Sequence, residues 1–163
     1  MEASLSRRAA AEFVGTAFLV AAVVGSGIMA ERLSGGNVAL ALLANTIATG
    51  AALVALIAAF SPISGAHLNP VVTLMTAFDG GLPLTEVLHY ATSQVLGGIV
   101  GAIGAHLMFG LQAISVGRHV RSGPAQTFSE FVATLGLICV IWGAARLRAG
   151  IAPIAVGAYI TAA

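Results

Sequence analysis

The sequence predicts an all-α membrane protein: a helical bundle with an inverted repeat, one re-entrant half-helix and an incomplete second half. Three observations predict this fold. Of the 163 residues, 58% are hydrophobic and 8% are charged, against about 25% charged residues in soluble domains. Four apolar stretches are long enough to cross a bilayer. A short apolar segment that begins with Asn69-Pro70 lies between two of them.

Gly, Pro and polar residues separate the apolar stretches, as loops do. Four stretches have roughly the length of a spanning helix: residues 9–29, 38–60, 84–109 and 128–145. Residues 69–78 are too few to cross the membrane, so we expect a re-entrant element there. A last apolar segment begins near residue 151 and is also too short to cross the hydrocarbon core alone.

The pattern Glu-Phe-Val-x-Thr occurs twice, at residues 12–16 and 130–134. Three crossings separate the copies, so the second copy enters the membrane from the opposite face, which defines an inverted-topology repeat. We expect one domain over residues 1–163, with a first repeat at about 9–109 and a partial second repeat at about 128–163. The second repeat shows no half-helix of its own, so we expect the chain to be roughly two-thirds of a larger protein.

The composition excludes several classes of function. A net charge of +1 argues against binding to nucleic acid. No acid–base pair, phosphate-binding loop or activated nucleophile predicts an enzyme, and the four histidines lack the spacing of metal ligands, so we expect no cofactor and no metal. All seven basic residues are Arg, a bias typical of GC-rich bacterial genomes. We expect a multi-pass protein of a bacterial inner (plasma) membrane.

Asn69 and Pro70 form the start of the short element. Pro70 suits the first helical position, where its missing N–H would have had no partner, and Asn69 becomes the cap. A broken segment at membrane depth is tolerated only where it is buried in protein or lines a water-filled cavity. The Asn69 amide and the positive end of the helix dipole would admit a neutral solute and repel a cation. A plain buried cap is the alternative interpretation.

Gly65, Ala66 and His67 precede this cap in an expected irregular conformation. Their carbonyl oxygens, freed from helical hydrogen bonds, would form a ladder of acceptors along a pore. We assign the backbone carbonyl of His67, rather than its ring, to this ladder.

Two carboxylates, Glu12 and Glu130, fall inside spanning helices, where a charge is costly. We expect each to accept hydrogen bonds from amides of a re-entrant loop; a proton relay is the alternative. Thr16 and Thr134 follow four residues later on the same helix faces. Gln94 is expected to bond a neighbouring loop or helix, since the small residues after it allow close helix approach.

Residues 64–73 read Ser-Gly-Ala-His-Leu-Asn-Pro-Val-Val-Thr. Together with the Glu-x-x-x-Thr helices and a Gln-x-x-Gly stretch, this segment closely resembles the first pore loop of the aquaporin and glycerol-facilitator (major intrinsic protein) family, with Val71 where that family usually has Ala. The resemblance implies six crossing helices and two half-helices, with the Glu residues orienting the loops. It also implies a homotetramer in the lipid bilayer, with one passive pore for water or small neutral solutes in each subunit.

The resemblance also points to Thr49, which lies 20 residues before Asn69, where the family places one residue of its selectivity filter. Water-selective members have a bulky aromatic residue there, so a small Thr implies glycerol-like or uncharged metalloid solutes. Val71 adds bulk where two half-helix tips would meet. The sequence therefore predicts a passive channel; the alternatives are a non-conducting truncated membrane polypeptide and a subunit of a small oligomeric transporter.

Overall fold

A computed structural model describes residues 3–115, 122–147 and 149–163. Every regular element in these ranges is helical, and one of the four histidines, His119, lies outside them. The elements in chain order are α1 (Leu5–Leu33), α2 (Val38–Ser64), α3 (Pro70–Phe78), α4 (Leu84–Met108), α5 (Pro124–Leu147), the 3-10 turn η1 (Ala149–Ile151) and α6 (Ala152–Ala162).

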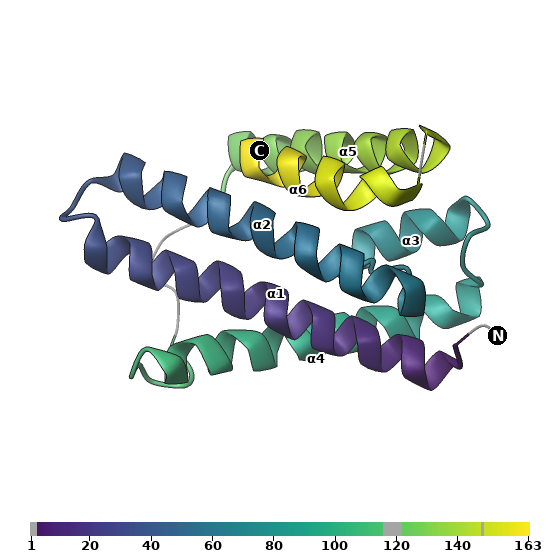
Figure 1. Ribbon diagram of the computed structural model, residues 1–163, viewed down its shortest axis with the longest axis horizontal. Helices are drawn as coiled ribbons and strands as arrows, with labels where there is room; N and C mark the ends of the chain where they lie inside the picture. Colours follow the sequence, from purple (N-terminus) through teal and green to yellow (C-terminus); the bar gives the residue numbers. More distant parts are fainter. Residues whose placement is uncertain (1–2, 116–121, 148) are drawn as a thin grey trace.

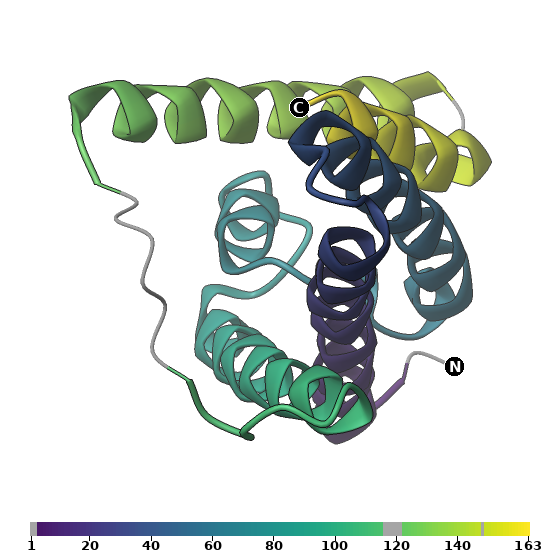
Figure 2. The ribbon, with the colours of Figure 1, turned by 90° about the vertical axis from the view of Figure 1, so that its left-hand side faces the viewer.

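Four of these helices, α1, α2, α4 and α5, are long and apolar enough to cross a membrane. Helices α1, α2 and α4 run roughly along one direction (Figure 1), whereas α5 lies across the view in which α1 is seen nearly end-on (Figure 2). The predicted fold class, an all-α helical bundle, is confirmed, and the chain is a multi-pass membrane protein.

The short helix α3 is a half-helix that does not cross the bundle. The chain leaves α2 and turns back, and α3 then returns to the end of the molecule where α4 begins (Figure 1). In Figure 2, α3 lies between α4 and α5, with α1 and α2 to one side of it. The loop that leads into α3 is packed inside the protein, since Ala66 and Leu68 are buried, and irregular backbone at membrane depth requires such a setting.

Helix α1 packs closely along α4. A Cβ atom at Gly97 or Gly101 of α4 would overlap the backbone carbonyl of Phe13 or Ala17 in α1, so glycine is required for this approach.

Polar contacts join the same two helices near both ends. The Arg8 guanidinium pairs with the Glu86 carboxylate at 2.7 Å. At the other end, Arg32 Nη2 donates to the Phe109 carbonyl at 2.9 Å. The two contacts fix the register of α1 against α4 over their whole length.

The main core joins the loop before α3 to four helices. Its buried members come from α2, the loop, α3, α5 and α6: Leu53, Ile57, Ala66, Leu68, Val72, Leu137, Ile138 and Val156. Helices α1 and α5, which carry the two Glu-Phe-Val-x-Thr copies, run in opposite directions (Figure 1). An inverted repeat requires these directions; the repeat boundaries remain a prediction.

Candidate functional site

The loop between α2 and α3 has an unusual backbone. Gly65, Ala66 and Leu68 have φ angles of 89°, 50° and 48°, which lie in the left-handed region. Only Gly adopts this region without cost, and each non-glycine residue there costs on the order of 1–3 kcal/mol. The loop can hold this conformation only because other groups bind its amides.

Glu12 binds those amides. Its side chain is fully buried, and Oε1 accepts from the His67 amide at 3.0 Å. Oε2 accepts from the Leu68 amide at 2.7 Å. The Ser64 hydroxyl donates to Oε1 at 2.6 Å, and the side-chain amide of Gln94 donates to Oε2 at 2.7 Å. All four partners donate, which suits a carboxylate because it accepts at both oxygens.

A second group of hydrogen bonds ties Gln94 to the start of α3. Gln94 Nε2 also donates to Thr73 Oγ1 at 2.9 Å, and Thr73 Oγ1 donates to the Asn69 carbonyl at 3.1 Å. His67 Nδ1 lies 3.2 Å from the same hydroxyl. The Thr73 hydroxyl hydrogen is already donated to the Asn69 carbonyl, so His67 Nδ1 must be the donor in its contact with Thr73. The imidazole is thus held against α3 on its Nδ1 side.

Asn69 caps α3 with its carbonyl oxygen. Oδ1 accepts from the amides of Val71 and Val72 at 2.8 and 3.4 Å. The carboxamide therefore faces the helix with its oxygen, and its NH2 group points away. Among the described residues no hydrogen bond ends on the carbonyl oxygens of Gly65, Ala66 or His67.

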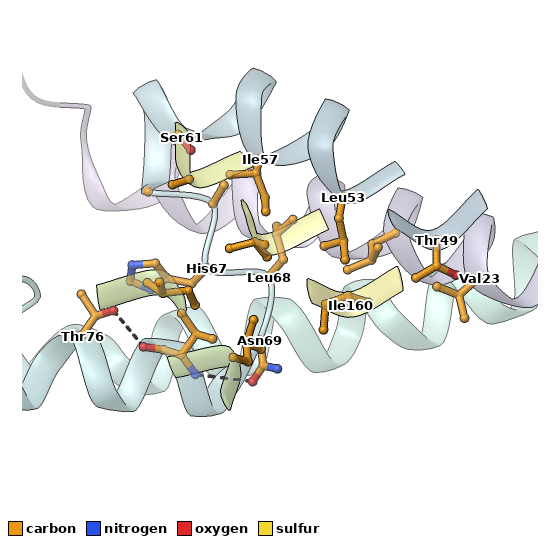
Figure 3. A pocket seen from close by; sticks show the side chains of 18 residues that line it. Val23, Thr49, Leu53, Ile57, Ser61, His67, Leu68, Asn69, Thr76 and Ile160 are labelled. Atoms are coloured by element: carbon orange, nitrogen blue, oxygen red, sulfur yellow. Dashed lines mark hydrogen bonds between the residues drawn. The ribbon is translucent and has the colours of Figure 1, made fainter. Parts of the chain in front are cut away.

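These groups meet at a cavity of about 330 Å³. One wall is the loop from Gly65 to Asn69, and the other walls are mostly aliphatic side chains of α1, α2, α5 and α6. Ser61, Ile57, Leu53 and Thr49 follow one face of α2 along it, and Val23 of α1 lies beside Thr49 at one end (Figure 3). Within the described part of the chain, no Asp, Glu, Lys or Arg lines it.

The structure brings five of the predicted pore residues to this cavity: Thr49, Gly65, Ala66, His67 and Asn69. Pro70 and Val71 are not among its lining residues; both are exposed at the tip of α3. The functional roles of all these residues remain predictions.

The predicted loop-orienting residues are placed differently from one another. Glu12 and Gln94 bond the loop or its surroundings directly. Thr16 is buried, but its hydroxyl has no hydrogen-bond partner among the described residues. Glu130 is exposed and lines a separate cavity of about 160 Å³. Neither Glu130 nor the half-buried Thr134 makes a side-chain hydrogen bond within residues 3–115, 122–147 and 149–163.

Sequence reasoning missed three polar residues of this network. Ser64 donates to Glu12 and accepts from the Ala66 amide at 3.1 Å. Tyr90 is fully buried, and its hydroxyl donates to the Ser64 carbonyl at 2.9 Å. The third is Thr73. Spacing carried a signal for two of them, since Thr73 follows Asn69 by four residues and Tyr90 precedes Gln94 by four, which places each pair on one helix face.

In the described ranges, no group of three or more His, Cys, Asp or Glu side chains is placed so that it could hold a metal ion. The polar groups of the site are amides, hydroxyls and carbonyls, with one carboxylate that is fully engaged. Amides, hydroxyls and carbonyls can donate hydrogen bonds to a neutral solute or accept them from it.

Comparison with known proteins identifies the family. The chain is 51% identical over 162 residues to aquaglyceroporin AqpS of Rhizobium meliloti (strain 1021). The aligned region covers 99% of this chain and 69% of that protein. It is 35% identical to aquaporin NIP1-1 of Arabidopsis thaliana, over 92% of this chain and 54% of the relative. It is 32% identical to a probable glycerol uptake facilitator protein of Thermotoga maritima, over 90% of this chain and 69% of the relative.

The chain thus spans between about half and about two-thirds of the length of these three relatives. The family model described as "Major intrinsic protein" matches residues 1–163. This match confirms the resemblance carried by the loop at residues 64–73, and the chain belongs to the major intrinsic protein family.

Proposed function

We propose that this protein is a passive transmembrane channel for water and small neutral solutes. The observation that carries the proposal is the cavity beside Asn69: its loop wall includes Gly65, Ala66 and His67, its other walls are mostly aliphatic, and no charged residue lines it within the described part of the chain. A solute in such a cavity exchanges some water contacts for contacts with the loop carbonyls and the Asn69 amide. Binding stays weak enough for release, as conduction requires.

Thr49 supports a glycerol-like solute class. It lies at one end of the cavity beside Val23 (Figure 3), and no side-chain hydrogen bond of Thr49 is formed among the described residues. A small side chain with an available hydroxyl leaves room for a polyol and can bond to it. The names aquaglyceroporin and glycerol uptake facilitator, printed for two relatives, point in the same direction. Uncharged metalloid hydroxides share the size and the hydroxyl groups of small polyols.

The test is stopped-flow light scattering on proteoliposomes that face gradients of water, glycerol or arsenous acid. In its complete form, the protein should conduct all three. Thr49→Phe should lower glycerol permeability relative to water permeability. Ile47→Phe, an exposed position two residues away on α2, serves as the matched control. Flux no greater than that of empty liposomes would overturn the proposal and favour the non-conducting alternative.

The assembly and the membrane belong to the same proposal: a homotetramer in a bacterial inner membrane. Large apolar side chains are exposed on α1, α2 and α4, among them Phe18, Ile47 and Ile99, and such faces must meet lipid or another subunit. Native mass spectrometry of the purified protein tests the stoichiometry. Flux that appears only in oligomers whose subunits share one pore would favour the small-transporter alternative.

A further inference from the structure

Asn45 of α2 forms a polar bridge to α1 that the pore network does not include. Its Nδ2 donates to the Val23 carbonyl at 2.8 Å and to Ser26 Oγ at 2.9 Å. Ser26 Oγ also donates to the Val23 carbonyl at 3.2 Å. The three groups close a triangle between two apolar helices. Interhelical hydrogen bonds of this kind hold membrane helices together where the hydrophobic effect cannot.

The bridge adjoins one end of the cavity. Val23, whose carbonyl accepts from Asn45, lines the cavity with its side chain, and so does Thr49, which lies one helical turn from Asn45. Figure 3 shows Val23 and Thr49 next to each other at that end. We call this pair the cavity mouth. The separation of α1 and α2 at Asn45 therefore determines the distance between the two side chains of the mouth.

The opposite side of α2 is fixed by backbone contact with α6. A Cβ atom at Gly50 would come within 2.8 Å of the Gly157 carbonyl oxygen, and one at Gly157 within 2.7 Å of the Gly50 carbonyl oxygen. Helix α2 is thus held against α6 by close packing and against α1 by the Asn45 bridge. Helix α2 cannot move closer to α6, because their backbones are already in contact at Gly50 and Gly157. If the Asn45 bridge is lost, we expect the separation of α2 from α1 to change, and the mouth lies between those two helices.

We propose that Asn45 is a positioning residue for solute selectivity, because its bridge to Val23 and Ser26 sets the width of the mouth between Val23 and Thr49. Asn45 does not line the cavity, so it acts through those two residues. The inference rests on the proposed channel function and adds to it the element that sets the size limit for small polyols.

The experiment compares permeability to glycerol and to erythritol, a longer polyol, in proteoliposomes. Asn45→Leu keeps a similar volume and removes both hydrogen bonds. It should raise the erythritol-to-glycerol permeability ratio by roughly threefold, the scale of one interhelical hydrogen bond. Ser26→Ala leaves the bond to Val23 and should shift the ratio less. Thr46→Val is the matched control, because the one hydrogen bond that the Thr46 hydroxyl makes to a described residue stays within α2, at the Leu43 carbonyl.

A second readout measures helix separation directly. Nitroxide labels at Phe18 and Ile47, exposed positions on α1 and α2, are introduced into a Cys139→Ser background. Asn45→Leu should lengthen or broaden the distance distribution, and Thr46→Val should leave it unchanged. A conducting parent with an unchanged polyol ratio in Asn45→Leu overturns the inference. A parent without flux overturns the channel function instead, and an unchanged label distance then overturns the role of Asn45 as well.

Discussion

Glu12 carries a carboxylate inside a transmembrane helix, and its surroundings show how the chain tolerates it. Two backbone amides, one hydroxyl and one carboxamide donate to its two oxygens. In return, these bonds hold Ala66 and Leu68 at positive φ. The energy of strained backbone is thus offset by charge-assisted hydrogen bonds, each worth more than a neutral one.

Replacing Glu12 with Ala should lower the yield and thermal stability of folded protein more than it alters selectivity. The change strands several buried donors, at ~1–3 kcal/mol for each. Detergent-solubilised yield and the melting temperature by fluorescence-detected gel filtration measure the effect. Glu31→Ala, an exposed glutamate on the same helix, should behave like the parent. A Glu12→Ala protein with parental stability would show that the loop needs no anchor.

Asn69 divides its two functions between the two ends of one carboxamide. The oxygen caps α3 through the amides of Val71 and Val72, and the NH2 group is the donor offered to a solute. A change that keeps the oxygen and removes the NH2 group therefore separates the structural role of Asn69 from its predicted role in the pore.

Asn69→Asp is that change. The cap should survive, because Asp caps helices as well as Asn does, so we expect normal protein levels. Permeability to neutral solutes should fall by about fivefold or more, since one lost hydrogen bond costs about 1 kcal/mol and a charge is added at membrane depth. Asn37→Asp, at the exposed cap of α2, is the control. Parental liposome swelling in Asn69→Asp would remove Asn69 from the pore.

At the scale of elements, the half-helix could be predicted from the sequence because two adjacent residues, the cap Asn69 and the first helical residue Pro70, mark its start. The expected element at 69–78 agrees with α3, which starts at Pro70 with Asn69 as its cap. The apolar stretch that predicts α2 ends at residue 60, where Ser61 and Pro62 follow. The helix continues to Ser64, since a proline in the last turn removes only one helical bond and Glu12 holds Ser64 from a distant part of the chain.

The polar network was harder to predict than the elements. The expectation that Glu12 lies near the loop needed only the repeat and the cost of a buried charge. The contacts of Ser64 and Tyr90 join residues that are far apart in sequence, and helix periodicity does not show which faces meet. Sequence patterns assign residues to faces, whereas pairing of faces depends on the packing of the whole bundle.

The packing of α1 on α4 gives a prediction with an internal control. Gly97→Ala should destabilise the protein by about 1–3 kcal/mol, because the added methyl group meets the backbone of Phe13 and overpacking carries that cost. Gly104→Ala, in the same helix but with open space at its Cβ, should leave stability unchanged or raised. Thermal unfolding in detergent measures both. Equal effects of the two substitutions would contradict close α1–α4 packing as the reason for glycine at position 97.

At the scale of the whole molecule, the position of α3 places the positive end of a helix dipole at the cavity. The tip of α3 borders the cavity through Asn69 and Val72, and its N-terminus carries a positive end equivalent to about half a charge. The cavity at this tip has no acidic lining residue in the described part of the chain. We therefore expect a cation at this tip to be repelled by the positive helix end.

We therefore expect proteoliposomes to pass water and glycerol without passing protons. The positive end of a half-helix excludes protons in pores of the aquaporin type, and the alternative proton path, through Glu12, is closed in this structure. Glu12 is fully buried, does not line the cavity and accepts four hydrogen bonds, so it has no contact with solute from which to take a proton. An entrapped pH-sensitive dye, read under a pH gradient with valinomycin and potassium, measures the flux. Proton flux in the parent that Glu12→Gln abolishes would restore the relay interpretation, whereas flux that persists in Glu12→Gln would show that the field at the tip of α3 is too weak to exclude a cation.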